Sequence, residues 1–289
     1  MQGKLPRRSE RGLEGLCERT DDEGCRAGSW IRIGRGSQGI ERLEAHFVGQ
    51  AFSPHRHDTY AIGITLSGVQ TFRYRGERRH CLPGQCHILH PDELHDGGAG
   101  TAEGFGYRIV YVDPSLIQQA LGGKSLPFVS NPIVEMSDFQ GILPPEMWRL
   151  EEPIDDVARV EIVTSVADVL DDASGTRLKK QSSLRLTSLL RICDLILADP
   201  TFRHSVETLE DLSGLDRWAL ARQFRAAFGT SPGRFRTMRQ LDRARRSIRC
   251  GLPLAEAALE AGFADQSHMS RMFKRTYGVT PARWAAALV

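Results

Sequence analysis

One degenerate pattern occurs twice in the last third of the chain, and this duplication constrains the fold more than any other feature. The first copy runs from Gly214 to Pro232 and the second from Gly262 to Pro281. Each copy has a glycine, an aspartate two or three residues later, matched arginine and phenylalanine positions, and a closing Gly-x-[Ser/Thr]-Pro. A tight turn followed by an Arg-bearing amphipathic helix is typical of a helix-turn-helix unit. The sequence therefore predicts two such units.

The second helix of each unit is expected to begin after an aspartate, at Asp216 and at Asp265, because aspartate is a favoured N-cap. Apolar residues then recur at helical spacing and predict one buried face. The residues expected to face inward are Leu220, Phe224, Phe228, Met269, Phe273 and Tyr277.

The opposite, polar faces of these helices are expected to contact DNA. Arginine can pair with guanine, glutamine with adenine, and tryptophan can pack against a thymine methyl group. The residues expected to face outward are Trp218, Ala221, Arg222 and Arg225 in the first unit, and Gln266, Ser267, Ser270, Arg271 and Lys274 in the second. Arg225, Lys274 and Arg275 are expected to contact phosphates, which position a protein without specifying sequence.

The charge is unevenly divided. Residues 201–289 carry 15 Lys and Arg against eight Asp and Glu, so a chain of net charge +2 has a basic C-terminal part and an acidic remainder. A basic module of this kind is typical of a nucleic-acid binder. A solvated helical surface and a non-specific DNA binder remain alternatives to a sequence-specific one.

Length and composition limit the classes of protein to which this chain can belong. A chain of 289 residues is long enough for two domains. No apolar run approaches the roughly 20 residues that span a bilayer, so no membrane partner is expected. Residues 1–27 are charged and glycine-rich and predict a flexible tail. Six scattered cysteines without a CxxC favour a reducing cytoplasm over a disulfide framework or a zinc finger.

The region 28–114 is expected to form strands. Residues 60–66 alternate in the period of two that predicts a half-buried strand, and frequent Gly and Pro turns favour a small barrel or sandwich. The pattern becomes helical afterwards. Residues 115–180 are expected to form connecting helices that are also candidate dimerisation helices. One helix is expected at about 154–172. Its Val and Ile stripe packs on the barrel, forms a dimer interface, or does both. Residues 184–289 are expected to form the all-α DNA-binding domain.

The histidines of the strand region suggest a ligand site. His55 and His57 lie just before the strand at 60–66, and His95 follows a turn. If the strand continues without a bulge, these two histidines share a face with the small residues Ala61 and Gly63, which leave room for a ligand. We therefore expect His55, His57, Tyr60 and His95 to bind a small-molecule effector. His80, His87 and His90 are expected on strand surfaces.

The stretch from about 184 to 286 resembles the DNA-binding domain of AraC/XylS-type bacterial transcription regulators. The most specific part runs from Gly262 to Lys274 and continues into Gly278-Val279-Thr280-Pro281. The resemblance implies seven helices, with a linker helix from about Pro232 to Cys250 between the recognition helices. It implies that the base-reading positions are Trp218, Ala221, Arg222, Gln266, Ser267, Ser270 and Arg271. It also places Glu210 where the family carries a small residue, as Ala258 does in the second unit. A buried, unpaired carboxylate would be costly there, and the Ala221 side chain is too short to hydrogen-bond a base. The first unit is therefore expected to make fewer base contacts.

The region 40–112 resembles, more loosely, the cupin-like sensor domain found in the same family, through the run Pro54 to Tyr60. Metal-binding cupins use three histidines and one glutamate. His55, His57 and His95 fit the histidines, but no glutamate follows His57 at the expected spacing. We therefore expect no metal and no other cofactor, although a three-histidine site can hold zinc or iron.

Taken with the resemblance, the residues predict a multi-domain α and β protein: a cupin-like β-barrel followed by an all-α domain with two helix-turn-helix units. Its expected function is sequence-specific binding of promoter DNA at two successive major-groove segments, as an effector-responsive activator and not an enzyme. The implied partners are double-stranded DNA, a small-molecule effector, RNA polymerase and a second copy of the chain. The alternative is a cupin-type metal-dependent enzyme with an appended helical domain.

Overall fold

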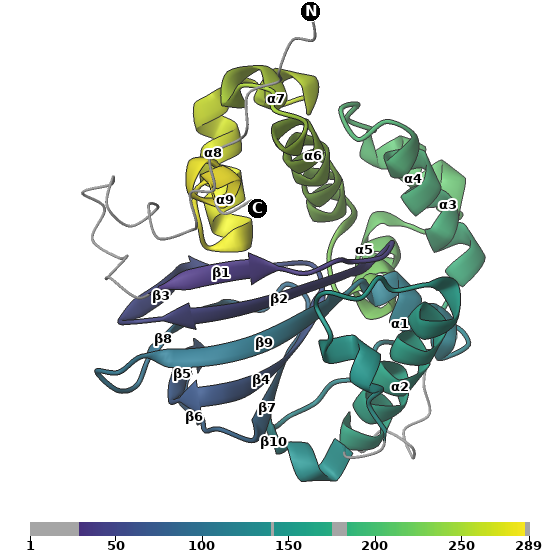
Figure 1. Cartoon of the computed structure of the whole chain (residues 1–289). Coiled ribbons are helices and arrows are strands. Elements are labelled where there is room, and N and C mark those ends of the chain that lie inside the picture. Colours follow the sequence, from purple (N-terminus) through teal and green to yellow (C-terminus); the bar gives the residue numbers. More distant parts are fainter. Residues whose placement is uncertain (1–28, 140–141, 175–183, 287–289) are drawn as a thin grey trace, which may run out of the picture.

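The computed structural model describes residues 29–139, 142–174 and 184–286. A two-sheet β region and two covering helices come first, and the remaining helices follow as a C-terminal all-α part (Figure 1). The flexible tail predicted at residues 1–27 lies outside the described residues.

The strands form two antiparallel sheets. A six-stranded sheet has the order β1-β2-β9-β4-β7-β10, and a four-stranded sheet has the order β3-β8-β5-β6. The strand bounds are β1 Trp30–Ile33, β2 Ile40–Phe47, β3 Gln50–His55, β4 Tyr60–Gly68, β5 Gln70–Tyr74, β6 Glu77–Cys81, β7 Gln85–Leu89, β8 His95–Ala99, β9 Phe105–Val112 and β10 Ile133–Glu135.

The cupin-like β domain is therefore present as a sandwich. The alternation along β4 separates two cores: Ala61 lies among the side chains between the sheets, whereas Tyr60 and Ile62 lie in the core on the other face of the six-stranded sheet. Among the described strands, no pairing joins the two sheets into a closed barrel. The expectation of a half-buried strand is wrong for most of β4, because helices cover its second face.

The helices have the following bounds: α1 Pro114–Ala120, α2 Asp156–Ser174, α3 Leu186–Ala198, α4 Val206–Ser213, α5 Arg217–Phe228, α6 Pro232–Arg249, α7 Leu254–Glu260, α8 Gln266–Tyr277 and α9 Pro281–Ala286. Two 3-10 turns, η2 Met136–Phe139 and η3 Pro145–Trp148, precede α2. Within the described residues, no helix is both long enough and apolar enough to cross a membrane.

Helix α2 packs on the sensor's own sheet. Ile162, Val163, Val166, Val169 and Leu170 are all buried in the core that α1 and α2 share with the six-stranded sheet. The Val and Ile stripe predicted from the sequence is thus used within the chain. Two other valines of α2, Val157 and Val160, remain exposed.

A buried arginine ties the start of the β region to the segment before α2. The Arg42 guanidinium donates hydrogen bonds to the backbone carbonyl oxygens of Arg35, Glu146, Arg149 and Glu152, and only 1% of the residue is exposed. All of its partners are neutral carbonyls, so this side chain satisfies backbone groups that strand pairing leaves unpaired.

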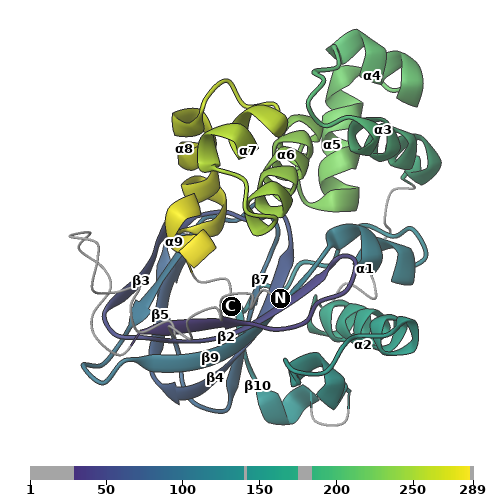
Figure 2. The same ribbon diagram turned by 45° about the horizontal axis from the view of Figure 1, so that its top comes forward.

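The all-α part lies along one end of the sandwich. Helix α6 runs between two groups of helices, with α7, α8 and α9 on one side and α3, α4 and α5 on the other (Figures 1 and 2). Each group has its own apolar core, and α6 contributes side chains to both. The linker helix expected from about Pro232 to Cys250 is present as α6.

Candidate DNA interface and effector site

The first helix-turn-helix unit consists of α4 and α5. Asp216 is the N-cap of α5, and its carboxylate accepts hydrogen bonds from the backbone N–H groups of Trp218 and Ala219 at 2.9 and 3.0 Å. Leu220 and Phe224 are buried against the rest of the domain. The opposite face is exposed: Trp218 is 70% exposed, and Ala221, Arg222 and Arg225 are exposed with it.

Glu210 is not the unpaired buried carboxylate that the family resemblance implied. Its Oε1 accepts the backbone N–H of Arg217 at 2.7 Å, and the carboxylate also pairs with the Arg217 guanidinium. Arg217 is the first residue of α5, so Glu210 from α4 satisfies a free N–H at the helix N-terminus, where a negative charge is favourable. The residue that departs from the family pattern therefore supports the recognition helix.

The second unit consists of α7 and α8. The Asp265 carboxylate accepts the backbone N–H of His268 at 2.6 Å, which confirms the predicted N-cap. Met269 and Phe273 are fully buried, and Ala258 of α7 is buried in the same core. The face of α8 away from this core carries the exposed residues Gln266, Ser267, Arg271, Lys274 and Arg275, with Ser270 half-buried.

Three histidines come together between the sheets at the end nearest the all-α part. The ring centroid of His95 lies 4.2 Å from that of His55 and 4.7 Å from that of His57, and the His55 and His57 centroids are 6.1 Å apart. We call His55, His57 and His95 the histidine cluster. The structure thus brings together three of the four residues predicted to bind an effector.

Hydrogen bonds fix how each ring of the cluster presents its nitrogens. The Nδ1 atoms of His55, His57 and His95 lie 2.8, 3.0 and 2.9 Å from the backbone carbonyl oxygens of residues 53, 59 and 93. A carbonyl only accepts, so these neutral rings carry their proton on Nδ1 and keep a lone pair on Nε2. Burial lowers the pKa of His55 to about 4 and that of His57 to about 3, so the rings are neutral at pH 7.

Tyr60 is not part of this cluster. Its ring is buried in the core shared with α1 and α2, and its hydroxyl donates to the carbonyl oxygen of Pro127 at 2.9 Å. The prediction failed because successive residues of β4 point to opposite faces of the sheet. Tyr60 therefore points away from the space between the sheets, which Ala61 faces.

Two further histidines that the sequence placed on strand surfaces are buried instead. His87 is fully buried, neither ring nitrogen has a hydrogen-bond partner, and burial lowers its pKa to about 4. It pairs in register with Gly63, where an added Cβ atom would lie only 2.1 Å from the imidazole. The small residue expected to leave room for a ligand therefore makes room for His87. His90 is buried among Tyr60, Tyr74 and Phe128, whereas His80 is exposed, as expected.

Over residues 29–139, 142–174 and 184–286, no three His, Cys, Asp or Glu side chains are arranged to hold a metal ion. The histidine cluster offers three nitrogen lone pairs, and these can accept hydrogen bonds from a small molecule.

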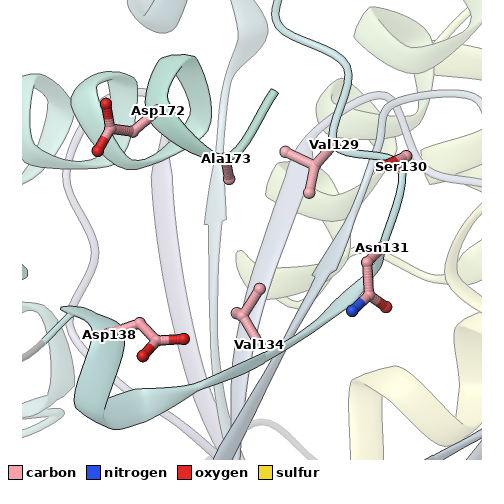
Figure 3. A pocket seen from close by; sticks show the side chains of 7 residues that line it. All are labelled: Val129, Ser130, Asn131, Val134, Asp138, Asp172 and Ala173. Atoms are coloured by element: carbon pink, nitrogen blue, oxygen red, sulfur yellow. The ribbon is translucent and has the colours of Figure 1, made fainter. Parts of the chain in front are cut away.

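A hollow of about 310 Å³ lies elsewhere on the sensor (Figure 3). Asp172 and Ala173 at the end of α2 line it on one side, and Val134 of β10 and Asp138 of η2 line it on the other. None of its lining residues belongs to the histidine cluster, so this hollow is not the predicted effector site.

Comparisons with known proteins agree with this architecture. The model of the AraC-like ligand binding domain matches residues 37–147, and that of a helix-turn-helix domain matches residues 210–287. An uncharacterized HTH-type transcriptional regulator of Bacillus subtilis (strain 168), YbfI, is 23% identical over 251 residues, which cover 80% of this chain and 86% of YbfI. The probable transcription factor PqrA of Proteus vulgaris is 30% identical over 80 residues, 27% of this chain and 66% of PqrA.

Solved structures show the same fold. ToxT from Vibrio cholerae superimposes with a TM-score of 0.60 at 14% identity, over 87% of this chain and 99% of ToxT. A ToxT structure with an unsaturated fatty acid bound gives 0.58 at 13% identity, over 91% and 96% of the two chains. The two matched family regions span well over half of the sequence, in the order sensor then helix-turn-helix, and the chain belongs to the AraC type of DNA-binding transcription regulators, a family of non-enzymes.

Proposed function

We propose that this regulator activates transcription in response to a small-molecule effector, and that α5 and α8 bind two successive major-groove segments of promoter DNA. The observation that carries the proposal is the pair of N-capped helices, each with a buried apolar face and an exposed polar face. Recognition helices of paired helix-turn-helix units contact segments about one helical turn, roughly 34 Å, apart. The base-reading residues are those predicted from the sequence, with Arg225, Lys274 and Arg275 on phosphates.

Competition binding tests the specificity. Genome-wide mapping of bound sites supplies the cognate duplex, which then competes with a random-sequence duplex at physiological salt. We expect the cognate duplex to win by about 10³-fold or more. Equal competition would make the protein a non-specific DNA binder. A promoter fused to a reporter gene distinguishes activation from repression.

Arg271→Ala tests base reading by α8. The side chain is exposed on the face away from the core of the unit. We expect the substitution to cost about 1–3 kcal/mol at the cognate site and to relax one base preference. Arg246→Ala, at an exposed arginine of α6 outside both recognition helices, is the matched control. A uniform loss on every sequence would make Arg271 a phosphate contact.

The histidine cluster is the proposed effector site. Three neutral, buried imidazoles with free Nε2 lone pairs favour a ligand that donates hydrogen bonds. A ToxT structure of the same fold holds an unsaturated fatty acid, and we infer that this sensor also receives a small molecule. His57→Gln should leave DNA binding without effector unchanged and weaken the transcriptional response, with thermal unfolding as the control for folding. An unchanged transcriptional response would exclude the histidine cluster as the effector site.

We further propose that the protein acts in the cytoplasm, that it forms a homodimer, and that it contacts RNA polymerase. Val157 and Val160 of α2 are 76% and 60% exposed, and an apolar pair on a sensor helix suits contact with a second copy. Sedimentation of the Val160→Lys variant tests this: the dimer should weaken if α2 is the interface. An unchanged mass would place the interface elsewhere.

A further inference from the structure

The hollow of Figure 3 lies at one edge of the six-stranded sheet, beside its last strand β10. The segment 129–131 lines it on the right of the view, the end of α2 and the turn η2 line it on the left, and β10 lies between them. Its volume of about 310 Å³ reaches the range of small-molecule sites, which begins at about 300 Å³. The hollow therefore has room for a compact organic molecule.

The floor of the hollow is apolar and preformed. Val129, Val134 and Ala173 point toward one another across it (Figure 3), and all three belong to or pack against the core under α2. The backbone N–H of Val129 donates to Nε2 of His90 at 3.0 Å, and the carbonyl oxygen of Pro132 accepts a hydrogen bond of 2.8 Å from β7. These bonds hold the wall in place without a ligand, so little conformational entropy is lost when a ligand binds.

The rim of the hollow is acidic. Asp138 and Asp172 are exposed, and both lie on the left of Figure 3. Among the described residues that line the hollow there is no lysine, arginine or histidine. The other polar lining residues, Ser130 and Asn131, are neutral, and Asn131 is tethered because its Oδ1 accepts the backbone N–H of Ile133 at 3.3 Å. The lining therefore carries a net negative charge and attracts a cation.

The end of α2 adds to this negative charge. The last turn of the helix carries Asp171 and Asp172 and no basic residue. Backbone carbonyl groups at the C-terminus of a helix form the negative end of its dipole, where carboxylates are unfavourable and cations are favourable. A cation in the hollow offsets both the dipole and the carboxylates. Local charge arrangements that are unfavourable without a ligand are expected at functional sites.

We propose that this hollow is a second small-molecule site of the sensor, and that it binds a compact organic cation. A primary ammonium or amidinium group donates charge-assisted hydrogen bonds to the carboxylates of Asp138 and Asp172, while the apolar body of the ligand covers the floor. A bare divalent metal ion suits the site less, because it requires six or more oxygen ligands and gains nothing from valine side chains. The site shares no residue with the histidine cluster, so the proposal depends neither on that cluster nor on DNA binding.

Three probes of similar shape and different charge test the ligand class on the full chain by isothermal titration calorimetry. They are cyclohexylmethylamine, which is a cation at pH 7, the neutral cyclohexylmethanol and the anion cyclohexanecarboxylate. We expect the amine to bind about tenfold more tightly than the alcohol, because hydrogen bonds from a charged donor are roughly twice as strong as neutral ones. The carboxylate should not bind measurably. Added salt should weaken the binding of the amine and leave that of the alcohol unchanged, because exposed charges are screened.

Substitutions locate the binding in the hollow. Asp138→Asn and Asp172→Asn each remove one negative charge and keep the shape of the side chain, so each should weaken binding of the amine by about tenfold and leave binding of the alcohol unchanged. The matched control is Asp168→Asn, at an exposed position of α2 that does not line the hollow, and it should bind the amine as the wild type does. Ala173→Leu fills the hollow with a good helix former and should weaken binding of both the amine and the alcohol.

Three results would overturn the proposal. Equal binding of the amine and the alcohol would show that charge does not select the ligand, and unchanged binding of the amine in both asparagine variants would place its site elsewhere. Displacement of the amine by a lower concentration of Ca²⁺, lost in both variants, would make the hollow a metal site. No binding of the amine at roughly 10 mM, a limit that fragment-sized ligands of ordinary efficiency pass, would remove the site altogether. If Ala173→Leu fails to fold, as judged by circular dichroism, the two exposed aspartates decide.

Discussion

Replacing His87 with leucine should stabilise the protein, and more so at acidic pH. The imidazole is fully buried beside Phe72 and Tyr107, and neither nitrogen has a hydrogen-bond partner. A buried polar group without a partner costs about 1–3 kcal/mol. His87→Leu removes this cost while filling similar space, so we expect a gain of about 1–3 kcal/mol in the free energy of unfolding at pH 7.

The pH dependence follows from the lowered pKa. Burial lowers the pKa of His87 to about 4 in the folded protein, whereas an unfolded histidine has a pKa of about 6.5. As the pH falls below 6.5, the unfolded chain takes up a proton that the folded protein does not, so this histidine destabilises the fold progressively down to its folded pKa. At pH 5 the difference of about 1.5 pH units from 6.5 corresponds to roughly 2 kcal/mol. The advantage of the leucine variant should grow by that amount between pH 7 and pH 5.

Urea unfolding at pH 7, 6 and 5, followed by circular dichroism, measures this difference directly. Asp58 titrates in the same range, because burial raises its pKa to about 6, but it is present in both proteins and its contribution cancels in the comparison. His80→Leu, at an exposed position of β6, is the matched control and should show no such trend. The reasoning is refuted if the advantage of His87→Leu stays constant between pH 7 and pH 5, or if the variant is less stable than the wild type at both.

Three further outcomes are expected. Arg42→Met should cost about 3–5 kcal/mol of unfolding free energy, because several buried carbonyl groups lose their donor at about 1–3 kcal/mol each; thermal unfolding measures it, and a loss below about 1 kcal/mol would mean that water replaces the guanidinium. Glu210→Ala should cost about 1 kcal/mol through the N-terminus of α5, seen as a lower urea midpoint, and an unchanged midpoint would contradict the capping role. Lys274→Ala should reduce the salt slope of DNA binding by about 0.9, whereas an unchanged slope would exclude its phosphate contact.

The recognition helices could be predicted from the sequence because their determinants are local. An N-cap aspartate, a left-handed glycine at the C-cap and apolar residues three and four apart lie within one helix, as at Asp216 and Gly229. The same holds for the linker helix α6. Glu210 was misjudged because its partner, the backbone N–H of Arg217, becomes available only when the turn brings α4 against α5.

The sensor was less predictable because its determinants are non-local. Alternation along β4 identified the strand but not which face lines the space between the sheets, so Tyr60 was placed with the histidines. The burial of His87 depends on its pairing with Gly63, 24 positions earlier in the sequence. The signal in the sequence that could have predicted a buried His87 is its place within the apolar run 86–89. Arg239 and Arg245 of α6 pair with Asp58 and Glu41 of the sensor. These contacts have no local signature in the sequence beyond the opposite charges of the two parts.

The register that sets Gly63 opposite His87 imposes an order on how these two positions can change. A side chain at position 63 cannot be added first, because its Cβ would lie 2.1 Å from the imidazole. A smaller residue at position 87 opens that space, and only then does alanine or a larger residue at 63 become tolerable. Gly63→Ala should therefore be severely destabilising alone and nearly neutral beside His87→Ser. Related sensors that carry a side chain at the position of Gly63 are thus expected to have lost the histidine at the position of His87.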